Sequence, residues 1–292
     1  MSATPSPGLY IVATPIGNLG DISERAKQLF AAADVVACED TRVAGKLLHL
    51  LGINAPAPTL GEARKRTPLL RHDDHSDAAA RAALIARMHD EVVVLVSDAG
   101  TPLISDPGYR LVRDARAAGV MVTSAPGACA AVAALSIAGL PTDRFLFAGF
   151  LPAKAKARDT AIAELAAIPT TLVFYESGPR LPAALAALAN GLGPREAAVA
   201  RELTKLHEEC VTGTLPELAT HYAEPPRGEI VIIVGPPLAV DAGPADDASI
   251  DSALTAALTT QSVARAAKAV AASHGITRDA AYARALVLAG KT

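Results

Sequence analysis

The 292-residue sequence has no tryptophan, and only 3% of its residues are aromatic. Proteins that bind single-stranded nucleic acid commonly stack the bases on aromatic side chains, so a stacking platform of that kind is not expected here. The formal net charge of −3 at pH 7 also excludes binding to nucleic acid through an overall positive charge. Any contact with RNA would come from local basic patches, for which residues 64–71 and 154–158 are candidates.

Cysteine is scarce, and long apolar runs are absent. Cys38, Cys129 and Cys210 are far apart and form no CxxC pair, which argues against structural zinc and fits the reducing cytoplasm. No stretch has the apolar length of a membrane span, and the first residues, MSATPSPG, lack the basic and apolar regions of a signal peptide. We therefore expect a cytoplasmic protein with no membrane contact and no bound metal.

Apolar runs alternate with alanine-rich helical stretches in the first half of the chain. Leu9–Ala13, Val35–Cys38 and Val92–Val96 are predicted strands, and residues 78–88 and 109–118 are predicted helices. The uninterrupted aliphatic run Val92–Val96 indicates a strand buried on both faces, as in a parallel sheet. This alternation predicts an α/β domain with a mainly parallel sheet over residues 1–124.

The second half predicts another α/β domain, over residues 125–237. Its strands are separated by longer helices, and residues 204–214 are expected to connect paired elements, so we expect a mixed sheet. A polar, proline- and glycine-containing linker is predicted over residues 238–249, followed by a small helical module over residues 250–292.

In that module, Thr277 is predicted to cap a helix over residues 278–288, which follows a helix over residues 262–273 in helix-turn-helix order. The module carries scattered basic residues, namely Arg265, Lys268, Arg278, Arg284 and Lys291. Two interpretations stay open: an appendage that docks on nucleic acid, or a helical cap that packs on the body and spreads its charges into solvent.

The segment after the Val92–Val96 strand, SDAGTPLISDPG, contains two aspartates, two glycines and two prolines. Ligands of open α/β sheets bind beyond the carboxyl ends of the strands, and a stiff backbone without bulky side chains suits a flat ligand held by main-chain groups. Residues 14–21, after the first strand, match neither the dinucleotide-binding nor the P-loop pattern. The sequence thus favours a ligand that is neither a dinucleotide nor ATP.

Two segments place acids and an arginine after a strand. Glu39-Asp40-Thr41-Arg42 could hold a polar substrate or form an ion pair at a helix start, and the segment FYESGPR repeats the order of strand, acid, turn and arginine. Residues 72–75 combine histidine with aspartate, but their loop-like spacing favours a solvated or substrate-contacting loop over a metal site.

Several segments occur in order across Leu9–Val234: LYIVATPIGNLGDIS, ACEDTR, VSDAGTPLISDPG, APGACAAVAALSIAGLP, FYESGPRL, RELTKLHEE and RGEIVIIV. Together they resemble the tetrapyrrole methylase family. Within that family they are most similar to the branch that methylates the 2′-oxygen of a cytidine in 16S ribosomal RNA, and the helical tail resembles the C-terminal module of that branch.

The resemblance implies two α/β domains of the tetrapyrrole-methylase type with a cofactor cleft between them, plus a small C-terminal helix-turn-helix-like module. It also implies a homodimer that binds S-adenosylmethionine (SAM) and acts on a cytidine in the decoding region of the small ribosomal subunit. The residues implied to bind the cofactor are Pro15, Asp98, Ala99, Gly100, Thr101, Ile104, Ser105, Ala128, Cys129 and Ala130.

The chemistry of such a reaction suggests roles for the polar segments. A ribose 2′-hydroxyl is a poor nucleophile, so a carboxylate that takes its proton would help; Glu176, Asp40 and Glu39 are the catalytic candidates. Arg42, His75 and Arg180 are the candidates for binding substrate. Two other functions stay open: SAM-dependent methylation of a small tetrapyrrole, and a non-catalytic protein that binds the ribosome.

Overall fold

The computed structural model describes residues 5–53, 67–73, 77–237, 247–274 and 276–290. The chain forms two units with separate internal contacts, residues 1–236 and residues 237–292. In these described ranges, no helix is both long enough and apolar enough to cross a membrane.

The first sheet has the strand order β3-β2-β4-β1-β5, and all its neighbouring strands run parallel. This confirms the predicted parallel α/β arrangement. The strands are β1 (Gly8–Val12), β2 (Val35–Cys38), β3 (Leu69–Arg71), β4 (Val92–Val96) and β5 (Val122–Ala125), and the helices are α1 (Glu24–Ala32), α2 (Thr41–Leu50), α3 (Ala78–Arg87) and α4 (Tyr109–Ala117).

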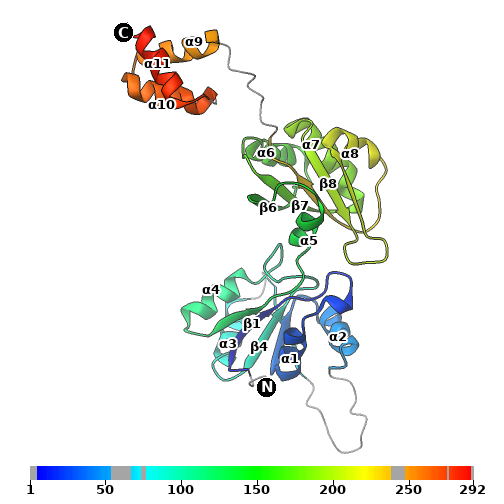
Figure 1. Cartoon of the computed structure of the whole chain (residues 1–292). Helices are drawn as coiled ribbons and strands as arrows, with labels where there is room; N and C mark the ends of the chain where they lie inside the picture. The colour runs from blue at the N-terminus through cyan, green and yellow to red at the C-terminus, as the bar shows by residue number, and fades with distance from the viewer. Residues whose placement is uncertain (1–4, 54–66, 74–76, 238–246, 275, 291–292) are drawn as a thin grey trace, which may run out of the picture. The chain divides into compact units, whose positions relative to one another are not determined.

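Helices cover both faces of this sheet (Figure 1). Successive side chains of a strand point to opposite faces: Tyr10 and Val12 of β1 pack with α1 and α2, whereas Leu9 and Ile11 pack with α3 and α4. Every residue of β4 is buried, as its aliphatic run predicted. The carboxyl ends of the strands, and the loops that follow them, therefore lie together at one edge of a rigid layer.

The second sheet has the order β6-β7-β10-β8-β9. Only β6 and β7 run parallel, and the other neighbours are antiparallel, so the predicted mixed sheet is confirmed. Its strands are β6 (Phe145–Phe150), β7 (Thr171–Ser177), β8 (Glu196–Arg201), β9 (Glu209–Thr214) and β10 (Glu229–Val234), and its helices are α5 (Ala130–Ile137), α6 (Ala155–Leu165), α7 (Leu181–Leu192) and α8 (Leu215–His221).

Helix α5 covers one face of the second sheet, and α6, α7 and α8 cover the other. Ile16, from the loop after β1, packs on the α5 face together with Leu203 and Val231, so the loops of the first sheet contact the second. The expected domain limit after Ser124 lies inside β5, one residue before its end. The domain limits stay a prediction.

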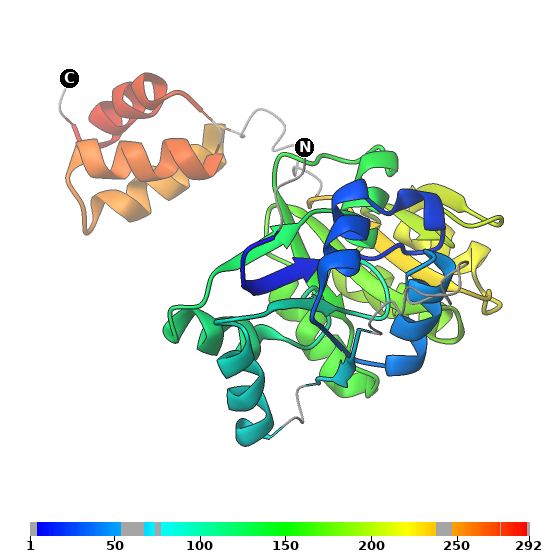
Figure 2. The same ribbon diagram turned by 90° about the horizontal axis from the view of Figure 1, so that it is seen from below.

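The C-terminal unit consists of α9 (Asp247–Leu258), α10 (Val263–His274) and α11 (Arg278–Leu288), which pack on one another (Figure 2). The Thr277 side chain accepts a hydrogen bond from Ala280 N, which confirms the predicted cap. Arg284 does not join an exposed basic patch, because its guanidinium pairs with Asp247 and Asp251 of α9. Lys291 lies outside the described residues, whereas Arg265, Lys268 and Arg278 are exposed.

Gly178, in the short 3-10 helix Gly178–Arg180, supplies a test of the packing around β7. A Cβ at this position would lie 1.9 Å from the carbonyl oxygen of Pro226, so the backbone would have to move. We predict that Gly178→Ala lowers the free energy of unfolding by about 1–3 kcal/mol, as overpacking does, when measured by urea denaturation.

The matched control is Gly45→Ala in α2. There the nearest atom to a new Cβ is Leu69 Cδ1, at an ordinary 3.5 Å, so alanine should raise stability by about 0.5–1 kcal/mol. A Gly178→Ala protein that unfolds at the wild-type urea concentration would contradict the described packing.

Candidate functional site

The loop between β4 and α4, residues 97–108, has an unusual backbone. Gly100 has a φ of 80°, and the non-glycine residues Leu103 and Ser105 have φ values of 75° and 64°. A non-glycine residue with a positive φ costs about 1–3 kcal/mol of conformational free energy, and it persists only where the surrounding structure holds it in place. Here the Thr101 hydroxyl donates to the Ala128 carbonyl oxygen at 2.9 Å, and Gly100 exchanges two backbone hydrogen bonds with Thr14.

This loop forms one wall of a cavity of about 360 Å³, and β7 and β10 of the second sheet form another. The volume lies within the usual range for small-molecule sites. The cavity combines apolar side chains with several carboxylates. It is lined by Ile16, Asp98, Ala99, Gly100, Thr101, Ile104, Ser105, Asp106, Ala130, Phe150, Tyr175, Glu176, Ser177, Leu203, Gly228, Glu229, Ile230 and Val231.

Glu176, near the end of β7, is a buried carboxylate in this lining, with 4% of its surface exposed. Its Oε1 accepts a hydrogen bond from Ser177 N at 2.8 Å and pairs with Arg180 Nε at 3.2 Å. The Arg180 guanidinium also donates a hydrogen bond to the Leu151 carbonyl oxygen. Glu176 Oε2 has no hydrogen-bond partner among the described residues. An unpaired buried carboxylate oxygen is costly, which makes Glu176 a candidate for contact with a ligand in the cavity that it lines.

Tyr175, also in the lining, fixes the wall next to Glu176. Its hydroxyl accepts a hydrogen bond from Ala131 N, at the start of α5, at 3.2 Å. Its ring meets Phe147 and Phe150 edge-on, with centroids 4.8 and 5.8 Å away. Burial raises the pKa of Tyr175 above its usual value, so this side chain stays neutral and serves as a wall.

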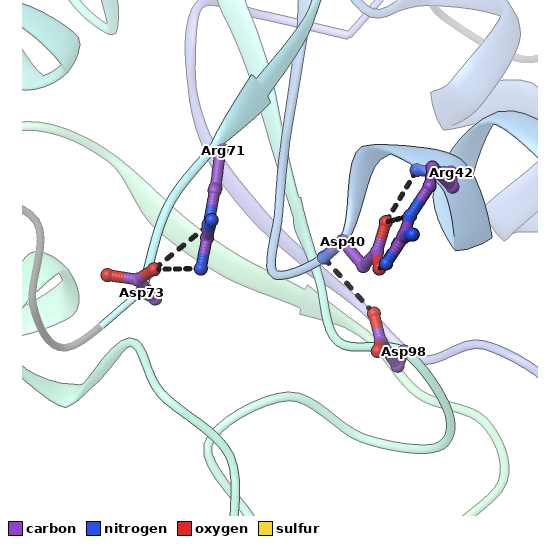
Figure 3. A network of polar contacts seen from close by, with 5 residues as sticks. All are labelled: Asp40, Arg42, Arg71, Asp73 and Asp98. Carbon is purple, nitrogen blue, oxygen red and sulfur yellow. Dashed lines mark hydrogen bonds and ion pairs between the residues drawn. The ribbon is translucent and has the colours of Figure 1, made fainter.

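Two arginines near the carboxyl ends of β2 and β3 are paired with acids two residues away (Figure 3). Asp40 caps α2 and binds Arg42 Nε at 3.0 Å, and the Arg42 guanidinium holds the pKa of Asp40 well below its usual range. Arg71 Nε binds Asp73 at 3.1 Å. The ion pair at a helix start, one of the two interpretations of residues 39–42, is therefore present.

Negative charge collects beside the cavity. The Asp40 backbone N–H donates to Asp98 Oδ1 at 3.2 Å, which ties the end of β2 to the cavity loop. Burial, and then the charges of Asp98 and Asp106, raise the pKa of Glu39; burial is also the main cause that raises the pKa of Asp106. Burial is the main cause of both shifts, and the neighbouring carboxylates add to it, so this side of the cavity favours a cationic group in a ligand.

Most of the residues expected to bind a cofactor line the cavity, together with Glu176. Three do not. Ala128 and Cys129 contact residues of the lining: the Ala128 carbonyl oxygen accepts a hydrogen bond from the Thr101 hydroxyl, and the Cys129 thiol lies 3.9 Å from the Tyr175 hydroxyl. Pro15 lines a neighbouring groove. Among the polar candidates, Glu39, Asp40 and Arg42 are outside the lining, and Arg180 supports Glu176. His75 and residues 64–66 lie outside the described residues.

Apart from Glu176, the sequence did not single out the part of the lining that comes from the strands of the second sheet. Tyr175 and residues 228–231 stand in the segments FYESGPRL and RGEIVIIV, which carried the resemblance but received no cofactor role. Asp106 belongs to the cavity loop itself. Phe150 and Leu203 reach the cavity only through the packing of the two sheets, so no local pattern could have found them.

A protein-family model described as Tetrapyrrole (Corrin/Porphyrin) Methylases matches residues 8–219, more than half of the chain. The chain belongs to the tetrapyrrole methylase family. A second model, described as RsmI C-terminal HTH domain, matches residues 244–289 and so covers the helices of the C-terminal unit.

Similar tetrapyrrole methylases resemble this chain along nearly its whole length. The ribosomal RNA small subunit methyltransferase I of Erythrobacter litoralis is 56% identical over 98% of both chains. The protein of the same name from Mesorhizobium japonicum is 48% identical over 97% of this chain and 92% of its own. A solved uroporphyrin-III C-methyltransferase from Thermus thermophilus, complexed with S-adenosylhomocysteine, has a TM-score of 0.50 at 23% identity, over 77% of this chain and 96% of its own; it supports the fold alone.

Proposed function

We propose that this protein is a SAM-dependent methyltransferase of 16S ribosomal RNA, and that it methylates the 2′-oxygen of a cytidine in the decoding region. The near-full-length relatives named ribosomal RNA small subunit methyltransferase I support the RNA substrate. The observation that carries the reaction is the buried Glu176, which lines a cavity of cofactor size and whose Oε2 has no hydrogen-bond partner among the described residues.

The cavity fits SAM in size, shape and charge. The sulfonium and ammonium groups of SAM match the carboxylates of Asp98 and Asp106, and its flat adenine matches the apolar side chains of Ile230 and Val231. The main chain of residues 98–101 and 104–105 and the start of α5 would hold the ligand, with Ala128 and Cys129 behind them. When bound, SAM supplies an activated methyl group. A protein of the same fold was solved in complex with S-adenosylhomocysteine.

Glu176 is the general base in this proposal. Ser177 N and Arg180 occupy Oε1, so Oε2 is left to accept the proton of the ribose 2′-hydroxyl as that oxygen forms its bond to the methyl carbon and the methyl–sulfur bond breaks. Asp40 is less suited, because its carboxylate already binds Arg42 and caps α2. Arg180 positions Glu176, and alignment of donor and acceptor supplies most of the remaining rate enhancement.

RNA contacts, assembly and location complete the proposal. The Arg42 side chain is 89% exposed, and Lys154 and Lys156 are exposed at the start of α6; these cations are placed to meet RNA phosphates. We further propose a homodimer that works in the cytoplasm on the small ribosomal subunit. Large exposed apolar side chains, such as Val132 and Leu206, support a protein interface in the second half.

Gly100→Trp tests the cofactor site. Gly100 lines the cavity, and a Cβ there would lie 3.3 Å from Ile16 Cγ2, so an indole must fill the space that SAM needs. We predict that calorimetric titration of this variant with SAM gives no saturable heat.

The matched control is Gly119→Trp, between α4 and β5. Gly119 has a similar positive φ of 75°, but no atom lies within 4 Å of a new Cβ, so this variant should bind SAM like the wild type. Wild-type affinity in Gly100→Trp would refute the placement of the cofactor, and thermal melting of both variants checks that they are folded.

Glu176→Gln tests the base. The amide keeps the shape of the side chain but cannot take the proton, so we predict that kcat for methyl transfer to small ribosomal subunits falls about 100- to 10,000-fold. The dissociation constant for SAM should stay within about twofold. Glu164→Gln, on the exposed side of α6, is the control and should turn over normally; normal turnover in Glu176→Gln would remove Glu176 from the mechanism.

A further inference from the structure

A second hollow borders the proposed SAM cavity. It is a groove of about 220 Å³ between the loop that follows β1 and one side of α2. Asp98 lines both the groove and the cavity. Thr14 lines the groove, and its backbone pairs with Gly100 of the cavity loop. A molecule in the groove would therefore lie next to the site of methyl transfer.

The walls of the groove are apolar and accessible. Leu19, Val43 and Leu50 line it, and their exposed fractions are 38%, 40% and 56%. Burial of exposed aliphatic surface is favourable, so three such side chains around one groove favour an occupant with an apolar face. Nucleobases that are turned out of a helix are commonly held between apolar or aromatic side chains.

Lys46 supplies a positive charge at the groove. It lies on α2 in the lining of the groove and is exposed, and no carboxylate of the described residues forms an ion pair with it. Arg42 on the same helix differs from it, because Arg42 forms an ion pair with Asp40. Lys46 is thus an uncompensated cation beside an apolar slot, which matches a phosphate attached to a flat base.

We infer that this groove holds the acceptor nucleotide of the RNA. Its base lies against Leu19, Val43 and Leu50, its phosphate binds Lys46, and its ribose faces the proposed SAM cavity, which Asp98 and Glu176 both line. This inference rests on the proposed function and adds the subsite for the substrate.

The test compares Lys46→Ala with Lys27→Ala, using SAM and small subunits purified from cells that lack this protein. Lys27 lies on α1 and pairs with Glu24, so its replacement controls for the loss of one positive charge. We expect Lys46→Ala to raise KM for the subunits about five- to tenfold and to reduce the slope of log affinity against log salt by about one, as the loss of one phosphate contact does. Its kcat and its dissociation constant for SAM should stay at wild-type values.

A second variant, Leu50→Ser, tests the apolar wall without a change of charge. It should raise KM for the subunits but leave the salt slope unchanged, and thermal melting should be unaltered because the side chain is exposed. If the wild type methylates the subunits and both variants have its KM and its salt slope, the groove is not the nucleotide subsite, although the proposed function stands. If the wild-type protein transfers no methyl group to the subunits, the proposed function fails and the inference fails with it.

Discussion

The backbone pairing between Thr14 and Gly100 is the contact on which the site depends. Thr14 N donates to Gly100 O at 2.8 Å, and Gly100 N donates to Thr14 O at 3.1 Å. This pairing joins the loop after β1 to the loop after β4, in which Gly100 itself has a positive φ. Ile16, two residues further on, packs against the second sheet. One pair of residues thus connects the parallel sheet, the cavity wall and the mixed sheet.

The opposite wall depends on a buried charge. Glu176 is held by Arg180 and by Ser177 N through a single oxygen, so the other oxygen is left without a partner in the described structure. The fold accepts the cost of this oxygen because the cavity beside it takes a ligand. Asp98 and Asp106 of the cavity loop line the same cavity, and burial is the main cause that raises the pKa of Asp106, to which the charge of Asp98 adds. Both halves of the protein therefore contribute negative charge to one cavity, as a cationic methyl donor requires.

Local patterns predicted the elements that local physics determines. The aliphatic run Val92–Val96 could only be a strand buried on both faces, and the glycine- and proline-rich loop after it had to lie at a ligand-binding edge. Strand β9, in contrast, is a partly buried edge strand with the polar sequence ECVTGT, so it gave no strand signal. Phe150 and residues 228–231 reach the cavity only because the two sheets pack together. The ion pairs of Arg284 could not be predicted either, because its partners on α9 lie far away in sequence. Tertiary contacts such as these cannot be predicted from a short stretch of sequence.

The atom that receives the methyl group is the most direct test of the proposed function. The purified protein would be given SAM with a radiolabelled methyl group and small ribosomal subunits from a strain that lacks this protein, and the labelled RNA would then be digested to nucleosides. The account predicts that the label is in 2′-O-methylcytidine from the 16S RNA. Label on a base or on another RNA would contradict the proposed function. So would the absence of label from all RNA if the same protein preparation binds SAM.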